Sequence, residues 1–429
     1  MLDVLDHLSR PHMKRATSNK KPASATHGGV AAFSLIAFLL AVALVRFTLP
    51  FGKDIVRSAL FVLGVTLCLL FLVDLSIQKV YRRSSTCLDF SRFDPALWRV
   101  MNKLLGLAGT LGLFAFIYWA VPEYRGNFYD RYFAMLRAIL PIWLALAIPY
   151  FYLVDCHMKQ PIDGYSQMGM VLTLRWSTIE RHMLSQHLLG WLVKGFFMPL
   201  MFTYLCNDLG KMIDFNFEQL SSTKTWFDFL YDLFFFVDVG FAAMGYLISL
   251  RLTDTHLRST ELTMLGWLVA LVCYEPFWSL LGRQYLAYDT GYQWGGWLWK
   301  YPVLYNIWAA SILTLTATYA WATVSFGARF SNLTHRGIIT NGPYRWTKHP
   351  AYITKNLSYW MISIPFLAQG GNTEALRHCL LLFGLNSLYV LRAKTEERHL
   401  SLDPVYVRYA EWIASHGIFR CLRLFAKRT

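Results

Sequence analysis

A polar segment near the C-terminus carries side chains that could bind a ligand. Residues 337–352 read GIITNGPYRWTKHPAY and lie between two apolar runs. Gly342-Pro343 marks a turn, and Pro350 suits the first turn of a helix that begins after it. The aromatic and ionisable side chains of the segment include Tyr344, Trp346, Lys348, His349 and Tyr352. His349 has two interpretations: it binds a ligand, or it starts the next helix and is satisfied by backbone groups.

A second polar segment follows one apolar hairpin later. Residues 392–409 contain the acidic pair Glu396 and Glu397, just past the last apolar run. A helix here places Arg392 and Glu396 on one face, where they could neutralise each other for roughly 0–1 kcal/mol. Alternatively, the carboxylates hold the ammonium group of a cationic cofactor, while nearby rings such as Tyr409 face a sulfonium or an adenine. The spacing leaves both interpretations open.

The elements that must position these segments are membrane-spanning helices. The chain has 429 residues, of which 55% are hydrophobic and only 16% charged, with a mean hydropathy of +0.34. Long apolar runs with few charges indicate spans of about 20 residues each. We therefore expect an all-α, polytopic integral membrane protein with about ten transmembrane helices. The expected spans are residues 30–51, 57–77, 101–121, 132–154, 187–206, 227–250, 263–282, 302–326, 351–369 and 376–391.

The distribution of Lys and Arg predicts the orientation of these spans. The net charge of +15 is concentrated in alternate loops and in both terminal segments, which the positive-inside rule places in the cytoplasm. Nucleic-acid binding is not expected, because no basic helix face or stacking motif accompanies the charge. We divide the chain into a flexible basic cytoplasmic arm (1–29), an N-terminal transmembrane bundle (30–250) and a C-terminal core (251–429) with a cytoplasmic cofactor site.

The cysteines and histidines do not predict a metal site. The seven cysteines are scattered and mostly lie in apolar runs, as reduced packing residues do. His182 and His187 are five positions apart and so do not share a helix face well.

Acidic residues inside the expected spans need partners. A charge in a bilayer costs at least ~2.5 kcal/mol, so it usually faces a cavity or an opposite charge. Asp238 and Glu275 lie in the sixth and seventh expected spans. In one interpretation they pair with Lys194, Arg137 or a Trp or Tyr donor and only hold helices together. In the other they line a cavity that holds the polar part of a lipidic substrate.

Together, the two polar segments resemble the isoprenylcysteine carboxyl methyltransferase and phospholipid methyltransferase superfamily. The resemblance rests on Gly337-Ile-Ile-x-x-Gly-Pro-Tyr-Arg-x-x-Lys-His-Pro-x-Tyr352, and on Glu396-Glu397-x-x-Leu followed by Tyr406-x-x-Tyr409. Members of this superfamily are integral membrane enzymes that use S-adenosylmethionine. The resemblance implies cofactor-binding roles for Tyr344, His349, Pro350, Tyr352, Glu396, Glu397 and Tyr409. It further implies that Arg392 steers a substrate carboxylate, while Glu396 or Glu397 is the nearest candidate base for an amine acceptor.

The chain departs from the superfamily pattern at three positions. Lys348 stands where an arginine is usual, Thr354 where a glycine is common, and Lys394 where a second arginine precedes the acidic pair. Lysine keeps the charge but loses the planar fork of arginine. The resemblance therefore supports cofactor recognition more strongly than carboxylate recognition.

These observations favour methyl transfer from S-adenosylmethionine to a lipid-like, isoprenoid-linked or other membrane-embedded acceptor. One alternative is an NADPH-dependent, sterol-reductase-like enzyme, although the motif around Tyr344 resembles the methyltransferase form. A non-enzymatic transporter or assembly factor is a further alternative, which the large N-terminal bundle favours. The acceptor, the host membrane and the oligomeric state stay open.

Overall fold

The computed structural model describes residues 20–289 and 293–420. Most of the predicted basic arm, residues 1–19, lies outside this part of the chain. The N-terminal helices are α1 (Gly28–Thr48), α2 (Ile55–Ser76), α3 (Leu97–Ala120), α4 (Asp130–His157), α5 (Gly164–Leu172), α6 (Arg181–Asp214) and α7 (Thr223–Leu247). The later helices are α8 (Met264–Leu271), α9 (Arg283–Tyr285), α10 (Trp294–Leu298), α11 (Pro302–Val324), α12 (Pro350–Ser363), α13 (Asn372–Leu400) and α14 (Pro404–His416).

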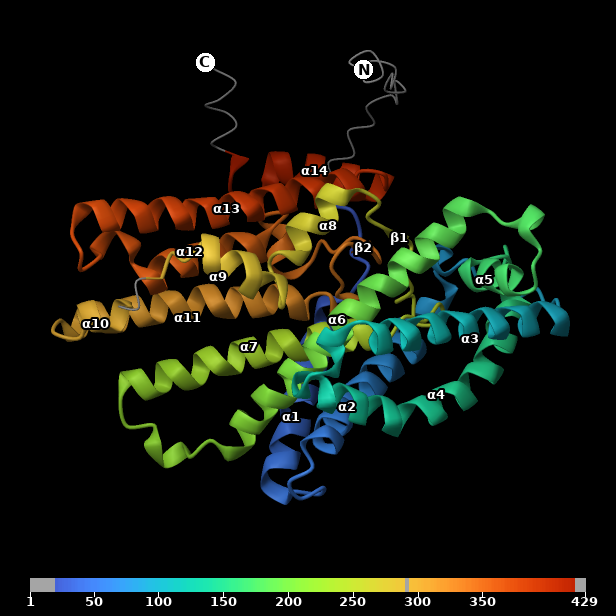
Figure 1. The fold of residues 1–429 in the computed structure, drawn as a ribbon, viewed down its shortest axis with the longest axis horizontal. Helices are drawn as coiled ribbons and strands as arrows, with labels where there is room; N and C mark the ends of the chain where they lie inside the picture. Colours follow the sequence, from blue (N-terminus) through green and yellow to red (C-terminus); the bar gives the residue numbers. More distant parts are fainter. Residues whose placement is uncertain (1–19, 290–292, 421–429) are drawn as a thin grey trace, which may run out of the picture.

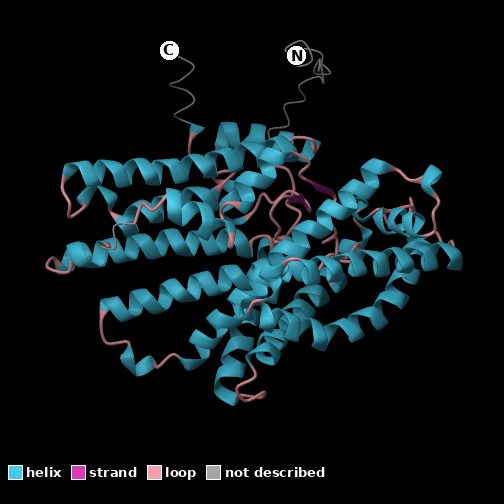
Figure 2. Ribbon diagram, in the orientation of Figure 1, coloured by secondary structure: helices cyan, strands magenta, loops and turns pink. Residues whose placement is uncertain are grey.

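The regular structure is almost entirely helical (Figure 2). Within the described ranges, six helical segments are long and apolar enough to cross a membrane: α1, α2, α3, Asn127–His157 with α4, α6 and α11. An all-α membrane protein therefore fits the structure. The number of about ten spans is not confirmed, and α12 has only 14 residues.

Residues 263–282, one of the expected spans, do not form one continuous helix. The helix α8 ends at Leu271, and the chain becomes helical again only in a short π-helical stretch, Trp278–Gly282, followed by α9. Pro276 lies between the two pieces and has no N–H to donate to a helical ladder. The apolar run is therefore long enough to span, but it folds as separate helical pieces.

The helices form two groups that meet near the centre of the molecule (Figure 1). In one group, α11 packs against both α7 and α12, and α13 packs against α12 and α8. In the other, α3 packs against α4 and α5, while α6 contacts α7, α4 and α2. The largest buried cluster lies where α1, α6 and α7 cross, around the rings of Phe38, Phe197 and Phe241.

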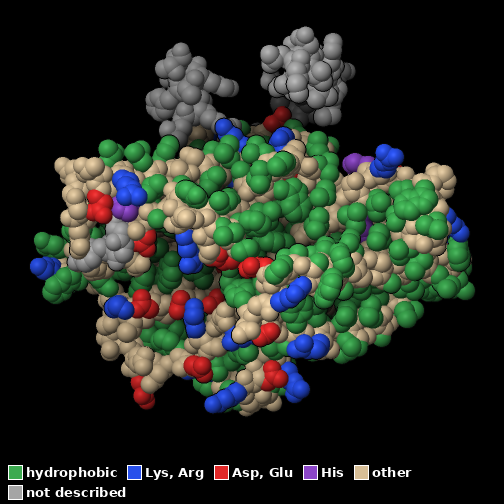
Figure 3. Space-filling model, in the orientation of Figure 1, with side chains coloured by type: hydrophobic (Ala, Val, Ile, Leu, Met, Phe, Trp, Pro, Cys, Tyr) green, Lys and Arg blue, Asp and Glu red, His purple; other side chains and the backbone are tan. Residues whose placement is uncertain are grey.

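Large apolar side chains cover much of the outer surface (Figure 3). Phe47, Leu146 and Phe116 are 77%, 62% and 59% exposed. In this view charged side chains are sparse over α3 and α4 and gather toward the lower and left-hand edges. Contiguous apolar surface of this extent is typical of a protein whose solvent is partly lipid.

A small non-helical region joins the two groups. Strand β1 (Ser259–Thr260) pairs antiparallel with β2 (Thr334–His335). Residues 20–27, called here the N-terminal strap, run along residues 338–341. Ala25 N–H donates to the Ile338 carbonyl at 2.9 Å, and Asn341 Nδ2 donates to the Thr26 carbonyl at 2.9 Å. This part of the predicted arm is therefore hydrogen-bonded to the loop that carries the motif.

Two arginines that the charge pattern assigns to loops are buried and hold this region together. Arg336 is 3% exposed, and its guanidinium donates to the carbonyls of Thr255 at 2.7 Å and Gly245 at 2.5 Å. Arg329 is 4% exposed and pairs with Asp254 at 3.1 Å. Burial, and then the charge of Arg329, lowers the pKa of Arg336 to about 9. Both side chains therefore fix loops rather than face lipid headgroups.

Candidate active site

The loop between β2 and α12 carries the first motif, and two of its glycines are required by the backbone. Gly337 has φ 110° and Gly342 has φ 54°, in the left-handed region that side chains with a Cβ disfavour. A Cβ on Gly342 would also overlap Ser325 Oγ, and one on Gly337 would lie 2.7 Å from Ala25 Cβ. The short helix Gly342–Arg345 then leads the chain to the start of α12.

The end of this loop is tied to α13 through one carboxylate. His349 Nε2 lies 2.8 Å from Glu397 Oε1, and Lys348 Nζ bonds the same oxygen. The His349 side chain makes no capping bond to the backbone at the start of α12. The two motif segments, far apart in sequence, therefore meet in space.

The electrostatics of Glu397 follow from these contacts. It lies on α13, beyond residue 391, where the expected span ends. Burial by itself would raise the pKa of Glu397. The hydrogen bonds and charges of His349 and Lys348 outweigh burial and lower the pKa to about 2. Glu397 is therefore ionised throughout the physiological range.

The neighbouring carboxylate, Glu396, has a different partner. Tyr352 Oη donates to Glu396 Oε2 at 2.9 Å. The Tyr352 ring also stacks on the His349 ring, with centroids 5.5 Å apart and planes inclined by 11°. One loop and two helices thus hold His349, Tyr352, Glu396 and Glu397 in a single cluster.

Arg392 does not pair with Glu396 as the helical spacing allowed. It is 7% exposed and forms no ion pair with any described residue. Instead, Arg392 Nη2 donates to Asn332 Oδ1 at 2.6 Å, and its guanidinium lies 5.5 Å and 5.4 Å from the ring centroids of Tyr274 and Tyr352. Neutral partners orient this cation but leave its charge uncompensated.

Sequence reasoning gave no role to Asn332 and Tyr274. Asn332 Nδ2 donates to Tyr274 Oη at 3.0 Å, so the two residues form one unit around Arg392. Asn332 lies in the loop between α11 and β2, whereas Tyr274 precedes α11 and belongs to the broken helical region. Only the tertiary structure brings Tyr274 to this site.

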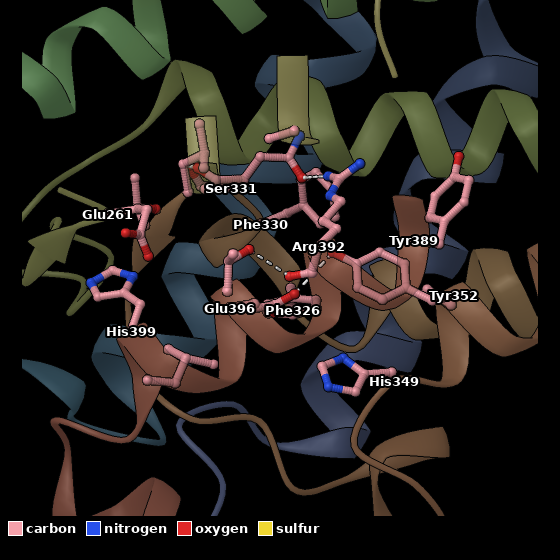
Figure 4. A pocket seen from close by; sticks show the side chains of 18 of the residues that line it. Glu261, Phe326, Phe330, Ser331, His349, Tyr352, Tyr389, Arg392, Glu396 and His399 are labelled. Atoms are coloured by element: carbon pink, nitrogen blue, oxygen red, sulfur yellow. Dashed lines mark hydrogen bonds between the residues drawn. The ribbon is translucent and has the colours of Figure 1, made fainter. Parts of the chain in front are cut away.

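These side chains surround a cavity of about 110 Å³. Figure 4 shows Arg392 and Glu396 on one helix, with Tyr352 to one side and His399 and Glu261 to the other. Aromatic side chains supply much of the remaining wall, namely Tyr274, Tyr319, Phe326, Phe330, Tyr344 and Tyr389. Small-molecule sites commonly measure about 300–1,000 Å³. The cavity must therefore widen before it can take a whole nucleoside cofactor.

A second cation, Lys355 on α12, also lines this cavity and was not predicted. Its Nζ lies 5.3 Å, 6.0 Å and 5.9 Å from the ring centroids of Tyr319, Tyr359 and Tyr389. No carboxylate of the described chain lies within ion-pair distance of it. The signal in the sequence was a lysine inside the expected span 351–369, because a charged side chain within a span needs a partner.

Not every residue expected at the site reaches the cavity. Glu397 and Tyr409 lie behind the motif loop, where Tyr409 Oη donates to the Tyr344 carbonyl at 2.6 Å. Pro350 is the buried first residue of α12. These three residues therefore hold the loop, whereas Tyr344, His349, Tyr352, Arg392 and Glu396 line the cavity.

The two acids expected to line a substrate cavity differ in their surroundings. Asp238 is buried and accepts a hydrogen bond from Tyr319 Oη at 2.9 Å, with a second bond from Thr323. Tyr319 and Thr323 line the cavity, and Asp238 lies behind them without lining it. Glu275 pairs with Arg283 at 3.3 Å, which is neither of the two cations considered from the sequence, and it does not line the cavity.

Comparison with protein families identifies this part of the chain. Residues 304–402 match the model of the isoprenylcysteine carboxyl methyltransferase (ICMT) family. The matched stretch begins in α11 and ends just after α13, so it contains the motif loop, α12 and the acidic pair. The C-terminal part therefore carries the signature of a family of membrane methyltransferases. Comparison with curated proteins and with solved structures gave no significant match.

Proposed function

We propose that the protein transfers a methyl group from S-adenosylmethionine to an acidic, membrane-embedded acceptor. The observation that carries the proposal is that Glu396 lines the same cavity as two cations, buried Arg392 and half-buried Lys355. Neither cation has a carboxylate of the described residues within ion-pair distance. A cationic donor and an anionic acceptor complement this arrangement of charges. The family match at residues 304–402 supports the reaction class.

The donor side of the cavity suits the chemistry of S-adenosylmethionine. Glu396 presents a carboxylate to an ammonium group, and the rings of Tyr344, Tyr352 and Phe326 offer faces to a sulfonium or an adenine. His349 and Glu397 hold the loop that bears Tyr344. The donor set therefore fits the cofactor, provided that the cavity opens. When bound, S-adenosylmethionine supplies a methyl group on positively charged sulfur.

The acceptor side suits a carboxylate. Arg392 and Lys355 can orient its oxygens, and an ionised oxygen needs no general base near neutral pH. As the new O–CH₃ bond forms, the C–S bond breaks and its electron pair stays on sulfur, so charge is neutralised on both partners. The protein then contributes alignment and the exclusion of water.

The position of the cavity relative to the helices supports access from both solvent and lipid. It lies at the C-terminal ends of α11 and α13 and at the N-terminal end of α12, which the positive-inside rule assigns to the cytoplasm. A water-soluble cofactor then enters from the cytoplasm. The acceptor arrives laterally, between helices.

Measuring which cofactor binds distinguishes a methyltransferase from an NADPH-dependent reductase. We expect the full chain, purified in uncharged detergent, to bind S-adenosylmethionine and not NADPH in equilibrium dialysis. Glu396→Gln should weaken the binding at least tenfold, a loss of about 1.4 kcal/mol. Glu411→Gln, an exposed change on α14, is the matched control. Binding of NADPH alone would replace the proposal with a reductase.

Label transfer tests the acceptor. Membranes that contain the protein, incubated with methyl-labelled S-adenosylmethionine, should yield a labelled lipid that releases its label in mild base, as a methyl ester does. Label that is stable to base would assign the methyl group to nitrogen or carbon. No label in any lipid or protein fraction, with cofactor binding intact, would contradict an enzymatic role.

A further inference from the structure

A second and larger cavity lies among helices of the N-terminal part. It measures about 450 Å³, within the range of about 300–1,000 Å³ that small-molecule sites occupy. Its walls come from α4, α5, α6 and the segment 247–260 that follows α7. Strand β1 separates it from the first cavity, since Ser259 and Thr260 line the second and Glu261 lines the first.

One side of this cavity is apolar and reaches the outer surface. Trp143 and Leu146 on α4 line it and are 36% and 62% exposed. Deeper in, Phe151 and Trp191 continue the apolar wall. The neighbouring outer surface of α4 is also apolar, with Ile142 and Ile148 exposed. A hydrocarbon chain can therefore enter from the lipid without crossing a polar barrier.

The other side of the cavity is rich in positive charge. Four lining side chains are Lys or Arg, and only two are Asp. Both acids are already engaged, because Lys103 Nζ lies 2.8 Å from Asp155 and 3.2 Å from Asp163. Arg258, the third cation, pairs with Asp254 at 3.2 Å, outside the cavity wall. Lys103 and Arg258 therefore have acidic partners among the described residues, and the other two lining cations do not.

These two remaining cations are Lys194 and Arg251. Lys194 projects from the middle of α6, and its Nζ lies 5.6 Å from the centroid of the Trp191 ring. The Arg251 guanidinium donates a hydrogen bond to the Thr86 carbonyl at 3.3 Å. Neither forms an ion pair with any residue that the structure describes. Both side chains are half-buried, and withdrawing a cation from water without a counter-charge is costly, so the described residues alone leave the site incomplete.

The imidazole of His256, close to these cations, also has an unsatisfied polar atom. His256 lines the cavity and is 9% exposed, yet its Nδ1 has no hydrogen-bond partner. Burial, and then the nearby Arg251, lowers the pKa of His256 to about 3, so the ring stays neutral. Buried polar atoms are satisfied in the great majority of cases. An unsatisfied imidazole nitrogen beside two unpaired cations is therefore informative.

We propose that this second cavity binds an acidic amphiphile of the membrane, a molecule with one anionic head and a hydrocarbon chain. The head sits between Lys194 and Arg251, close to His256, and the chain leaves past Phe151 and Trp143 toward the lipid. Arg251 and His256 follow the end of α7 that the positive-inside rule assigns to the cytoplasm, and Lys194 lies deeper, inside α6. Basic pockets between helices at that surface suit anionic lipid heads.

Native mass spectrometry of the full chain in uncharged detergent tests the proposal. The probes are oleate, oleyl alcohol with the same chain and no charge, and acetate with the same head and no chain. We expect oleate to bind at least tenfold more tightly than either. Equal binding of oleate and oleyl alcohol would overturn the role of the cations, and equal binding of acetate would overturn the role of the chain.

Substitutions assign the binding to this cavity. Lys194→Met should weaken oleate binding at least tenfold, about 1.4 kcal/mol. Lys211→Met on the same helix removes an exposed lysine paired with Asp208, and should leave the binding unchanged. Without oleate, the melting temperature of Lys194→Met should equal or exceed that of the natural chain. A lower melting temperature with unchanged oleate binding would show that Lys194 only supports the fold.

Photocrosslinking keeps the test independent of any variant. A fatty acid with a diazirine at mid-chain, applied to the natural protein, should label peptides from 143–151 and 186–194. Excess oleate should remove this label, and oleyl alcohol should not. Labelling confined to peptides that line the first cavity would contradict the proposal, while the proposed methyl transfer would stand.

Discussion

His349 Nε2 lies 2.8 Å from the Oε1 atom of Glu397, although 48 positions separate the two residues in the sequence. This contact closes the hairpin of α12 and α13 at the end where the cavity lies. Lys348 adds a second bond to the same carboxylate oxygen. Glu397 thereby fixes the position of the whole motif loop, and Glu396, the next residue, is left to face the cavity.

Loss of this anchor should affect both cofactor binding and turnover. In Glu397→Gln the amide cannot neutralise His349 and Lys348, and hydrogen bonds to charged groups contribute about 1.5–3 kcal/mol. We expect S-adenosylmethionine to bind at least tenfold less tightly, a loss of about 1.4 kcal/mol, as measured by equilibrium dialysis. The same change at exposed Glu411 should have no effect. Unchanged affinity in Glu397→Gln would separate the loop anchor from cofactor binding.

The depressed pKa of Glu397 predicts the response of stability to acid. The carboxyl has a pKa of about 2 in the folded chain, below its ordinary value of 4.5. Its contribution is fully present above pH 4.5 and is lost as the pH falls toward 2. We expect the difference in melting temperature between the natural chain and Glu397→Gln to shrink over that interval. A difference that is constant with pH would assign the effect to packing.

The planar fork of Arg392 should matter for the acceptor and not for the donor. Arg392→Lys keeps the charge, but a lysine cannot both bond Asn332 and present a second donor in the same plane. We expect kcat/KM for an acidic acceptor to fall at least tenfold, while the Kd for S-adenosylmethionine changes less than twofold. Equal losses in both quantities would place Arg392 in cofactor binding.

The backbone of the motif loop can be tested at Gly342. Gly342→Ala forces a side chain into φ 54° and into contact with Ser325 Oγ. Gly52→Ala is the matched control, because Gly52 has φ 59° with nothing within 4 Å of an added Cβ. Strain in φ alone costs about 1–3 kcal/mol, so both variants should melt earlier. Gly342→Ala should melt earlier still and should lose activity, whereas Gly52→Ala should keep it.

The N-terminal strap should contribute to the site although it lies over 300 positions away from the motif. Lys21 Nζ donates to the Thr340 carbonyl at 3.1 Å, and Thr26 Oγ1 donates to the Ser325 carbonyl at 2.7 Å. Removing residues 1–27 should therefore lower both activity and melting temperature. Removing residues 1–19 leaves these contacts in place and should be tolerated. Equal activity of the two truncated chains would show that the strap has no role.

Much of the helical architecture follows from the sequence. Runs of about 20 apolar residues predicted helices at nearly every place where the structure has a long one, because a helix satisfies all of its own backbone groups in lipid. The run at 263–282 is the exception. Its composition favours a helix, but the proline at 276 removes a donor, and the chain breaks there.

The sequence by itself determined the chemical types at the candidate site and the two segments that carry them, since motif spacing is a local property. The tertiary structure alone decided which residues face the cavity. It separated Glu396 from Glu397, which are adjacent on one helix, and gave them different partners. It also brought Tyr274, Asn332 and Lys355 to the site, because their neighbours come from helices whose packing no local pattern encodes. The charge of Arg336 shows the same limit: its sequence position indicates a surface loop, and only packing shows that it is buried.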